Sequence, residues 1–341
     1  MRRRGWIGSA LAGVTVVTLL AGCSSQENNA DNATRDPATP AAAPAATAAP
    51  AGEVTPSTPI SLLVSEPATG ILAAATTAGD TPVLRLTDTA TPANHRTTDV
   101  PLPGKAASLA LGKPGEILVA VPGGILRVDA ASAKVTEIAI DGDVHAVALR
   151  PDGSLVAGLA NGKVLLLDAD GTVRHTISGL SSADAVEAGD GAVVVLDRRQ
   201  TAIVQLDGTS KLGLSLRAGD GASNMIGDHF GRRIVTDTAG QELLVYTADP
   251  LVLHQRFPVG SSPYALAYDQ RSETVWVTLT GSNEVVGYDL STGIPVEVGR
   301  YPTVRQPNAV TIDGRTGDMF VGSATGDGLQ RIGADQRKRG Q

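Results

Sequence analysis

The chain has 341 residues, with 39 glycines, 3% aromatic residues and a single cysteine. That composition excludes a disulfide framework and a thiolate metal cluster, and it favours short strands and tight turns over long helices. The 28 Lys and Arg stand against 35 Asp and Glu, for a net charge of −7, so nucleic acid is not an expected partner.

Residues 1–22 have the pattern of a lipoprotein signal peptide. Arg2–Arg4 are basic, and Gly5–Leu20 form an apolar run that is too short to cross a bilayer comfortably. The letters LAGC end at Cys23 and resemble a bacterial lipobox, in which the cysteine sulfur receives a diacylglycerol. We therefore predict lipidation of Cys23 and anchoring at the outer face of the cytoplasmic membrane. The alternative is an ordinary signal peptide with an incidental cysteine.

Residues 23–56 are rich in Ala, Pro and Thr and contain very few large apolar side chains. Such a segment buries too little surface to offset the entropy lost on ordering. We predict a flexible tether that begins at the lipidated cysteine and holds the following domain away from the membrane. Its Thr and Pro content would also suit O-linked glycans, which the sequence leaves open.

A repeated unit fills residues 57–335. The clearest copy runs from Ser262 to Thr303, and its alternating apolar pattern and turn residues predict four strands: Tyr264–Tyr268, Thr274–Leu279, Glu284–Asp289 and Val296–Tyr301. Similar copies recur about every 40 residues, a period typical of β-propeller blades. Counting them predicts an all-β, seven-bladed β-propeller.

The last copy begins at Gln306 and has only three predicted strands. A ring of blades must close or leave unpaired strand edges. We expect Glu53–Ser57, just before the first copy, to supply the missing fourth strand. Residues 336–341 form a basic tail that we expect to be flexible.

Several segments resemble a known group of propellers. "SPYALAYD", "QPNAVTID" and "VVVLDRRQTAIVQLD" are similar to the YVTN/NHL class of bacterial repeats. "DPLVLHQRFPV" and "VVGYDLSTGIPVEVGRYPTVRQPN", together with the lipobox, resemble the mycobacterial LppL-type surface lipoproteins of actinobacteria. This resemblance implies a propeller in the cell envelope, without an assigned reaction and without a catalytic motif that could be transferred to this chain.

One column of the aligned copies is a candidate site. The first strand of each blade lines the channel of a propeller, so the residue at its start should lie at one mouth. That column contains Ile60, Ala107, His145, Asp184, Asn224, Tyr264 and Asn308. Five polar groups in consecutive copies, His145 to Asn308, would form a pocket for a ligand or a cation. The alternative is that they simply bind water.

The aspartates that end second strands have a simpler interpretation. Asp197 and Asp237 recur at one position of the repeat. Aspartate at strand ends commonly accepts hydrogen bonds from nearby backbone N–H groups. We predict that these two residues hold turns rather than perform chemistry.

The leading functional hypothesis is a monomeric, non-enzymatic binding or scaffolding module that uses no cofactor. Its partner would be an envelope protein or a small ligand. The alternative is a lactonase-like hydrolase. In gluconolactonase-like propellers a carboxylate and Asn side chains surround a divalent ion, and Asp184, Asn224 and Asn308 could hold Ca²⁺ or another such ion in a similar way. The present chain departs from that family at Ile60, where the family has Glu.

Overall fold

A computed structural model describes residues 34–89, 96–189, 192–208 and 211–337. The predicted signal peptide, Cys23 and residues 23–33 of the predicted tether lie outside the described residues, as does most of the basic tail. The described residues form 26 β-strands and no helix, which confirms the all-β class. They accordingly contain no helix with the length and apolarity of a membrane span.

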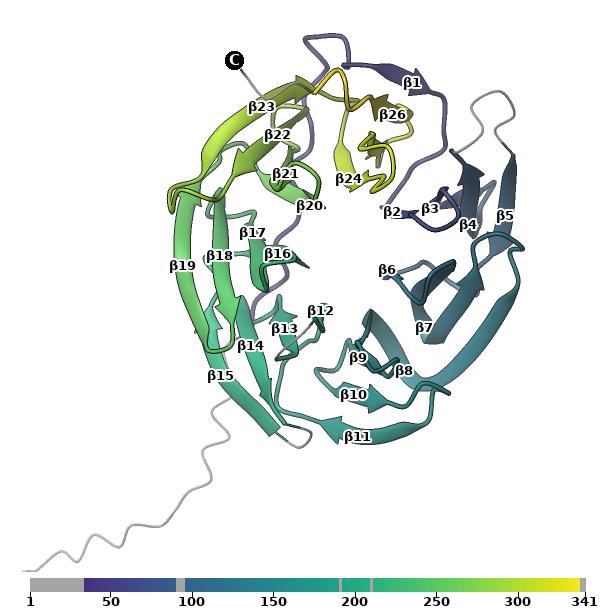
Figure 1. Cartoon of the computed structure of the whole chain (residues 1–341), viewed down its shortest axis with the longest axis vertical. Coiled ribbons are helices and arrows are strands. Elements are labelled where there is room, and N and C mark those ends of the chain that lie inside the picture. Colours follow the sequence, from purple (N-terminus) through teal and green to yellow (C-terminus); the bar gives the residue numbers. More distant parts are fainter. Residues whose placement is uncertain (1–33, 90–95, 190–191, 209–210, 338–341) are drawn as a thin grey trace, which may run out of the picture. The chain divides into compact units, whose positions relative to one another are not determined.

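The strands form six antiparallel sheets, arranged around a central opening (Figure 1). In chain order the first sheet is β2 (Leu62–Glu66), β3 (Ile71–Ala78), β4 (Thr81–Asp88) and β5 (Thr97–Pro101). The second has six strands: β6 (Ser108–Leu111), β7 (Glu116–Asp129), β8 (Val135–Leu149), β9 (Leu155–Leu159), β10 (Val164–Leu167) and β11 (Val173–Ile177).

The remaining four sheets have four strands each. They are β12 (Ala185–Glu187), β13 (Val194–Asp197), β14 (Ala202–Asp207) and β15 (Lys211–Arg217); then β16 (Ala222–Gly227), β17 (Arg232–Asp237), β18 (Glu242–Ala248) and β19 (Leu251–Pro258); then β20 (Pro263–Asp269), β21 (Thr274–Leu279), β22 (Glu284–Asp289) and β23 (Val296–Pro302). The last sheet combines β24 (Pro307–Ile312), β25 (Met319–Ser323) and β26 (Leu329–Ile332) with β1 (Glu53–Thr55).

The predicted count of seven blades is wrong, because the structure has six sheets. Two copies of the repeat that the sequence predicts to be separate blades, Lys105–Asp141 and Val144–Leu180, belong to the single six-stranded sheet. Its strand β8 pairs with β7 through its first part and with β9 through its second. The boundary between the two copies falls at Gly142, but this residue adopts a φ of 131° and the strand runs on through it. A conformation that only glycine adopts readily thus joins two repeats into one sheet.

The ring closes as the sequence predicts. Strand β1 pairs antiparallel with β26, with Glu53 opposite Arg331 and Thr55 opposite Leu329. Figure 1 shows the purple β1 beside the yellow β26. Strand β1, the first of the described residues, therefore completes the sheet made by β24, β25 and β26, which confirms the predicted role of the segment that begins at Glu53.

The core lies between neighbouring sheets. The middle strands β9, β10, β13 and β21 are buried at every residue, as strands covered on both faces must be. One cluster joins Leu196 of β13 to Val235 and Tyr246 of the next sheet. Burying each such side chain contributes roughly 1.5–3 kcal/mol. Because each sheet covers its neighbour, a sheet that stood alone would expose its apolar faces to water.

Residues 35–51, hereafter the strap, lie against the ring. The strap has no strand or helix of its own, but the N–H of Arg35 bonds to the carbonyl of Arg199, and the N–H of Ala51 bonds to that of Pro302. This differs from our expectation of a flexible tether for these residues. The physical reason is that loops distant in sequence provide hydrogen-bonding partners that the segment's composition does not reveal.

The start of the basic tail is also held. The side chain of Arg337 is 3% exposed, and its guanidinium lies over the ring of Trp276, 5.1 Å from the centroid. Asp269 forms an ion pair with it at 3.5 Å. Arg337 of the predicted flexible tail therefore packs against the ring, whereas Gln336 is exposed.

Candidate functional site

A cavity of about 680 Å³ runs along the centre of the ring. The innermost strand of each sheet lines it, together with the second half of β8. Four of the five predicted polar residues line it, each within two residues of the start of its strand: Asp184, Asn224, Tyr264 and Asn308. His145 is half-buried beside them. Ala107 also lines the cavity, whereas Ile60 is only 1% exposed and belongs to the core.

Asp184 is the most heavily engaged of these groups, with a side chain that is 8% exposed. Its Oδ1 lies 3.0 Å from Nδ1 of His145, and its Oδ2 accepts the hydroxyl of Ser182 and the N–H of Arg198 at 2.9 Å. Burial alone would raise the pKa of this carboxyl, but the hydrogen bonds from these three residues bring the pKa below its usual value. The carboxylate is therefore charged near neutral pH, and each of its oxygens accepts at least one hydrogen bond from the protein.

The other mouth residues bond to their immediate neighbours. Asn224 Nδ2 donates to the carbonyl of Tyr264 at 3.0 Å, across two adjacent sheets. Asn308 Oδ1 accepts from Nε2 of Gln306 at 3.0 Å. The structure thus joins the predicted residues in two pairs, His145 with Asp184 and Asn224 with Tyr264, and ties Asn308 to Gln306.

These contacts do not suit a divalent ion at Asp184, Asn224 and Asn308. A hard cation binds several oxygen atoms directly, but both carboxylate oxygens of Asp184 and the amide oxygen of Asn308 already accept protein hydrogen bonds. The part of the chain that the structure describes also has no group of three or more His, Cys, Asp or Glu placed to hold a metal. In this arrangement Asp184, Asn224 and Asn308 hold neighbouring loops and strands in place through hydrogen bonds.

The repeated aspartates hold turns, as predicted. The side chain of Asp197 accepts the N–H groups of Ser181 and Gln200, at 2.7 and 3.0 Å. Asp237 accepts three backbone N–H groups, those of Asp220, Gly221 and Gly240, at 2.8–2.9 Å. Both carboxylates are fully buried. Each fixes the loop that leads into an inner strand and thereby positions Asp184 or Asn224 at the mouth.

Sequence reasoning missed Asn283 and Gln306. Asn283 follows the second strand of its sheet, and its Oδ1 accepts the N–H of Gln306 at 3.0 Å, just as the aspartates accept N–H groups elsewhere. Asn283 directly precedes β22, the position that Thr201, and not Asp197, has in its own sheet. The repeated aspartates therefore did not point to it, although Thr201 accepts the N–H of Ala222 in a similar way. Nothing in the sequence marks the side chain of Gln306, which bonds to residues more than 260 positions away.

The strap contacts the residues that build the mouth. Arg198, whose N–H bonds to Asp184, donates from Nη2 to the carbonyl of Ala38 at 2.7 Å. Gln306 accepts the N–H of Ala43 at 2.8 Å and donates to the carbonyl of Ala41 at 3.1 Å. Its Nε2 also reaches Asn308. The strap and the mouth therefore belong to one hydrogen-bonded network.

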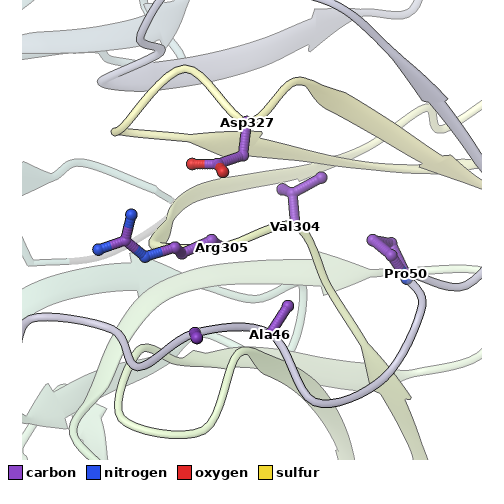
Figure 2. A pocket seen from close by; sticks show the side chains of 6 residues that line it. Ala46, Pro50, Val304, Arg305 and Asp327 are labelled. Atoms are coloured by element: carbon purple, nitrogen blue, oxygen red, sulfur yellow. The ribbon is translucent and has the colours of Figure 1, made fainter.

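A second cavity of about 600 Å³ lies between the strap and the ring. Figure 2 shows Ala46 and Pro50 of the strap facing Val304, Arg305 and Asp327 of the ring loops. Arg305 Nε donates to the carbonyl of Ala43 at 3.4 Å. Asp327 accepts hydrogen bonds from Ser323 and Thr325 in its own loop. This space is open, and polar and apolar groups both border it.

The opposite end of the channel has different chemistry. Glu187 lines the channel there, and its loss of solvation raises the pKa to about 7, although the charge of Arg233 and the N–H of Gly227 act in the other direction. Nearby on the ring, the hydroxyl of Tyr268 lies 2.7 Å from Nδ1 of His229. This end therefore carries a carboxyl that can change its charge near neutral pH.

No protein-family model matches this chain, and no curated protein matches it in sequence. Solved structures do resemble its fold. A streptogramin B lyase aligns with a TM-score of 0.67 at 14% identity, over 83% of this chain and 96% of its own.

U3-55K aligns with a TM-score of 0.69 at 12% identity, over 84% of this chain and 100% of its own. A chain of the mitotic checkpoint complex gives 0.68 at 13% identity, over 87% and 98%. Identities this low show the fold alone. Together with the ring of sheets, they show that this chain is a β-propeller.

Proposed function

We propose that the chain is a cell-envelope lipoprotein of the LppL type whose propeller is a binding or scaffolding module for a protein or a small ligand. One observation carries the binding role: an extended peptide, the strap, already lies on the ring and is held there by ring side chains. The fold is compatible with that role. By its name, one of the similar structures is part of an assembly, the mitotic checkpoint complex.

The chemistry of the mouth supports binding over catalysis. A hydrolase needs a reactive group that is free to attack, to exchange a proton or to hold a metal. Asp184, the carboxylate at the mouth, is instead committed to His145, Ser182 and Arg198. We therefore rank the lactonase-like alternative below the binding module.

Anchoring at Cys23 would place the mouth face near the membrane. The strap begins to contact the ring at Arg35, and the chain from Cys23 to Arg35 can span at most roughly 40 Å when fully extended. The face that carries the strap would then lie within that distance of the lipid surface. A partner of this face would itself be close to the membrane.

The binding role is tested with the lipidated full-length protein in its own envelope. A photo-crosslinking residue at the exposed position Ala107, which lines the channel, should capture a specific envelope protein or a discrete small molecule. The same crosslinker at exposed Asp152, outside the channel lining, is the matched control. Identical capture at both positions, or none at Ala107, would refute binding at this mouth.

A further inference from the structure

The strap is held along a rim shared by four neighbouring sheets. Arg35 contacts the loop of Arg199 in the sheet of β12–β15, and its Nη1 donates to the carbonyl of Asp220 at 2.7 Å, before β16. The hydroxyl of Ser262, just before β20, accepts the N–H of Ala41 at 2.9 Å. The side chain of Gln306, just before β24, accepts the N–H of Ala43. An extended chain thus crosses the loops at the start of successive inner strands.

Ring side chains recognise mainly the strap backbone. Arg198, Gln306 and Asn283 donate to the carbonyls of Ala38, Ala41 and Pro44, at 2.7, 3.1 and 3.0 Å. Gln306 and Ser262 accept the N–H groups of Ala43 and Ala41. Main-chain hydrogen bonds of this kind are how proteins bind extended peptides, while pockets for side chains select the sequence.

The ring leaves room for only small side chains at two positions of the strap. Ala43 is 5% exposed, so a larger residue there would collide with the ring. Ala38 packs on Gly221, since a Cβ built on that glycine would lie 2.8 Å from the Cβ of Ala38. Leucine at either position would have to displace the strap from its loops. Small-to-large changes at close-packed positions are costly.

Proline spacing prepares the segment for this conformation. Pro37, Pro40, Pro44 and Pro50 fix φ and have no N–H, and the N–H groups that bond to the ring come from other residues, Arg35, Ala41, Ala43 and Ala51. A proline-rich chain is already extended before it binds, so it loses little entropy on docking.

We propose that this rim is a groove for extended, proline-spaced peptide segments with alanine at the two contact positions, and that the strap is its resident occupant. The partner is a protein segment of the same chemistry, which binds when it takes the place of the strap. Arg198 and Gln306 also bond to Asp184 and Asn308. Replacement of the strap by a partner segment would therefore alter the hydrogen bonds of residues at the channel mouth. This inference rests on the proposed binding role and names its surface.

The test uses the complete mature chain, produced without lipid and labelled with a fluorophore at Cys23, its only cysteine. A recognition site for a specific protease is inserted between the exposed Thr47 and Ala48, which leaves β1 in the ring. After cleavage, fluorescence anisotropy reports whether the labelled strap fragment stays on the ring. An unlabelled peptide with the sequence of residues 34–46 is then added as competitor.

We expect the cleaved fragment to stay bound at micromolar protein and to be displaced by the competitor. A competitor with A38L and A43L should be at least roughly tenfold weaker, because neither leucine fits. Gln306→Ala removes two strap bonds and should weaken retention on the order of tenfold. Gln255→Ala, on the outer strand β19, is the matched control and should leave retention unchanged.

Release of the fragment at every concentration, or equal competition by the alanine and leucine peptides, would overturn the groove. The peptide series decides the outcome even if Gln306→Ala does not fold, which its thermal melt would reveal. If crosslinking at Ala107 captures a partner while the fragment does not bind, the proposed function stands and the groove does not. The opposite pair of results would retain the groove and remove the proposed partner at the mouth.

Discussion

Single carboxylates decide much of the local structure of this ring. Asp197 and Asp237 each bring together backbone N–H groups from two loops, and both are fully buried. A buried charge is tolerated when donors surround it and is costly when they do not. Glu187 has fewer donors, so its pKa rises to about 7. Acidic residues therefore hold the loops at one end of the channel, through Asp197 and Asp237, and provide a titratable group, Glu187, at the other.

Asp237→Ala should be strongly destabilising. It leaves three N–H groups, of Asp220, Gly221 and Gly240, without their acceptor, and each unsatisfied buried group costs about 1–3 kcal/mol. We expect urea unfolding to show a loss of at least about 3 kcal/mol. The exposed turn residue Asp152, changed to Ala, serves as control and should cost well under half of that. Equal losses would mean that Asp237 does not pin these loops.

Glu187 should make stability depend on pH. Its pKa in the fold, about 7, lies above its ordinary value of 4.5, so between these values the folded state binds more protons than the unfolded state. The free energy of unfolding therefore falls as pH rises through this window, by roughly 1–3 kcal/mol. Unfolding at pH 5 and pH 8 should show the fall, and Glu187→Gln should remove it. The control Glu137→Gln, at an exposed position, should leave the fall unchanged. If the fall persists in Glu187→Gln, another group causes it.

Divalent ions should have little effect at the mouth. Because Asp184 and Asn308 already accept protein hydrogen bonds, we expect Ca²⁺, Mg²⁺ and Zn²⁺ to leave the Tm unchanged to within about 1 °C. A ligand that binds only the folded state would raise it. A rise of several degrees that Asp184→Ala abolishes would restore the lactonase-like alternative.

At the scale of strands, the sequence predicted most of the pattern. Of the four predicted strands in the copy from Ser262 to Thr303, two have the same bounds as β21 and β22. The other two are shorter than the observed strands, by one residue at each end of β20 and by one residue at the end of β23. Alternating apolar residues between clear turns make such strands readable. The sequence failed at Gly142, because an Asp-Gly pair that commonly marks a hairpin turn here continues a strand and merges two repeats.

The site was only partly predictable for a related reason. Alignment of the repeats correctly suggested that Asp184, Asn224, Tyr264 and Asn308 share one channel. It could not show the strap, since the strap binds through backbone groups that every residue possesses. Composition reports whether a segment can fold by itself, not whether a distant loop offers it partners.

Ring closure should depend on one side chain of β26. Gln330 is fully buried, accepts the N–H of Val304 and donates to the carbonyls of Ala51 and Pro302. Gln330→Ala leaves the N–H of Val304 and the carbonyl of Ala51 without these partners beside β1, while the carbonyl of Pro302 keeps the N–H of Ala51. We expect a loss of about 2–4 kcal/mol in urea unfolding. Gln330→Glu keeps the shape but loses the donors and should rescue little. If either variant matched the wild type, β1 would be held by its strand pairing alone.

At the scale of the whole molecule, our proposal places a rigid ring close to a membrane with one face covered by its own N-terminal segment. The fold carries the rigidity, through cores shared between neighbouring sheets. The anchor at Cys23 and the partner are proposals that rest on the sequence pattern and on the strap.

Cys23→Ser tests the anchor. Without the sulfur no diacylglycerol can be attached, so we expect the protein to move from the membrane fraction to the soluble extracytoplasmic fraction or to accumulate unprocessed. Mass spectrometry of the wild-type N-terminus should show the added lipid. Persistence of a mature-sized Cys23→Ser protein in the membrane fraction would contradict lipid anchoring.

The pairing of β1 with β26 has a consequence for how the chain is made. Residues 53–55 leave the ribosome before every other described strand of the ring, and residues 329–332 leave it after all of them. Strand β1 therefore stays without its partner until β26 has been made. A stop codon anywhere within the sheet of β24–β26 should leave an open arc of sheets exposed to proteases.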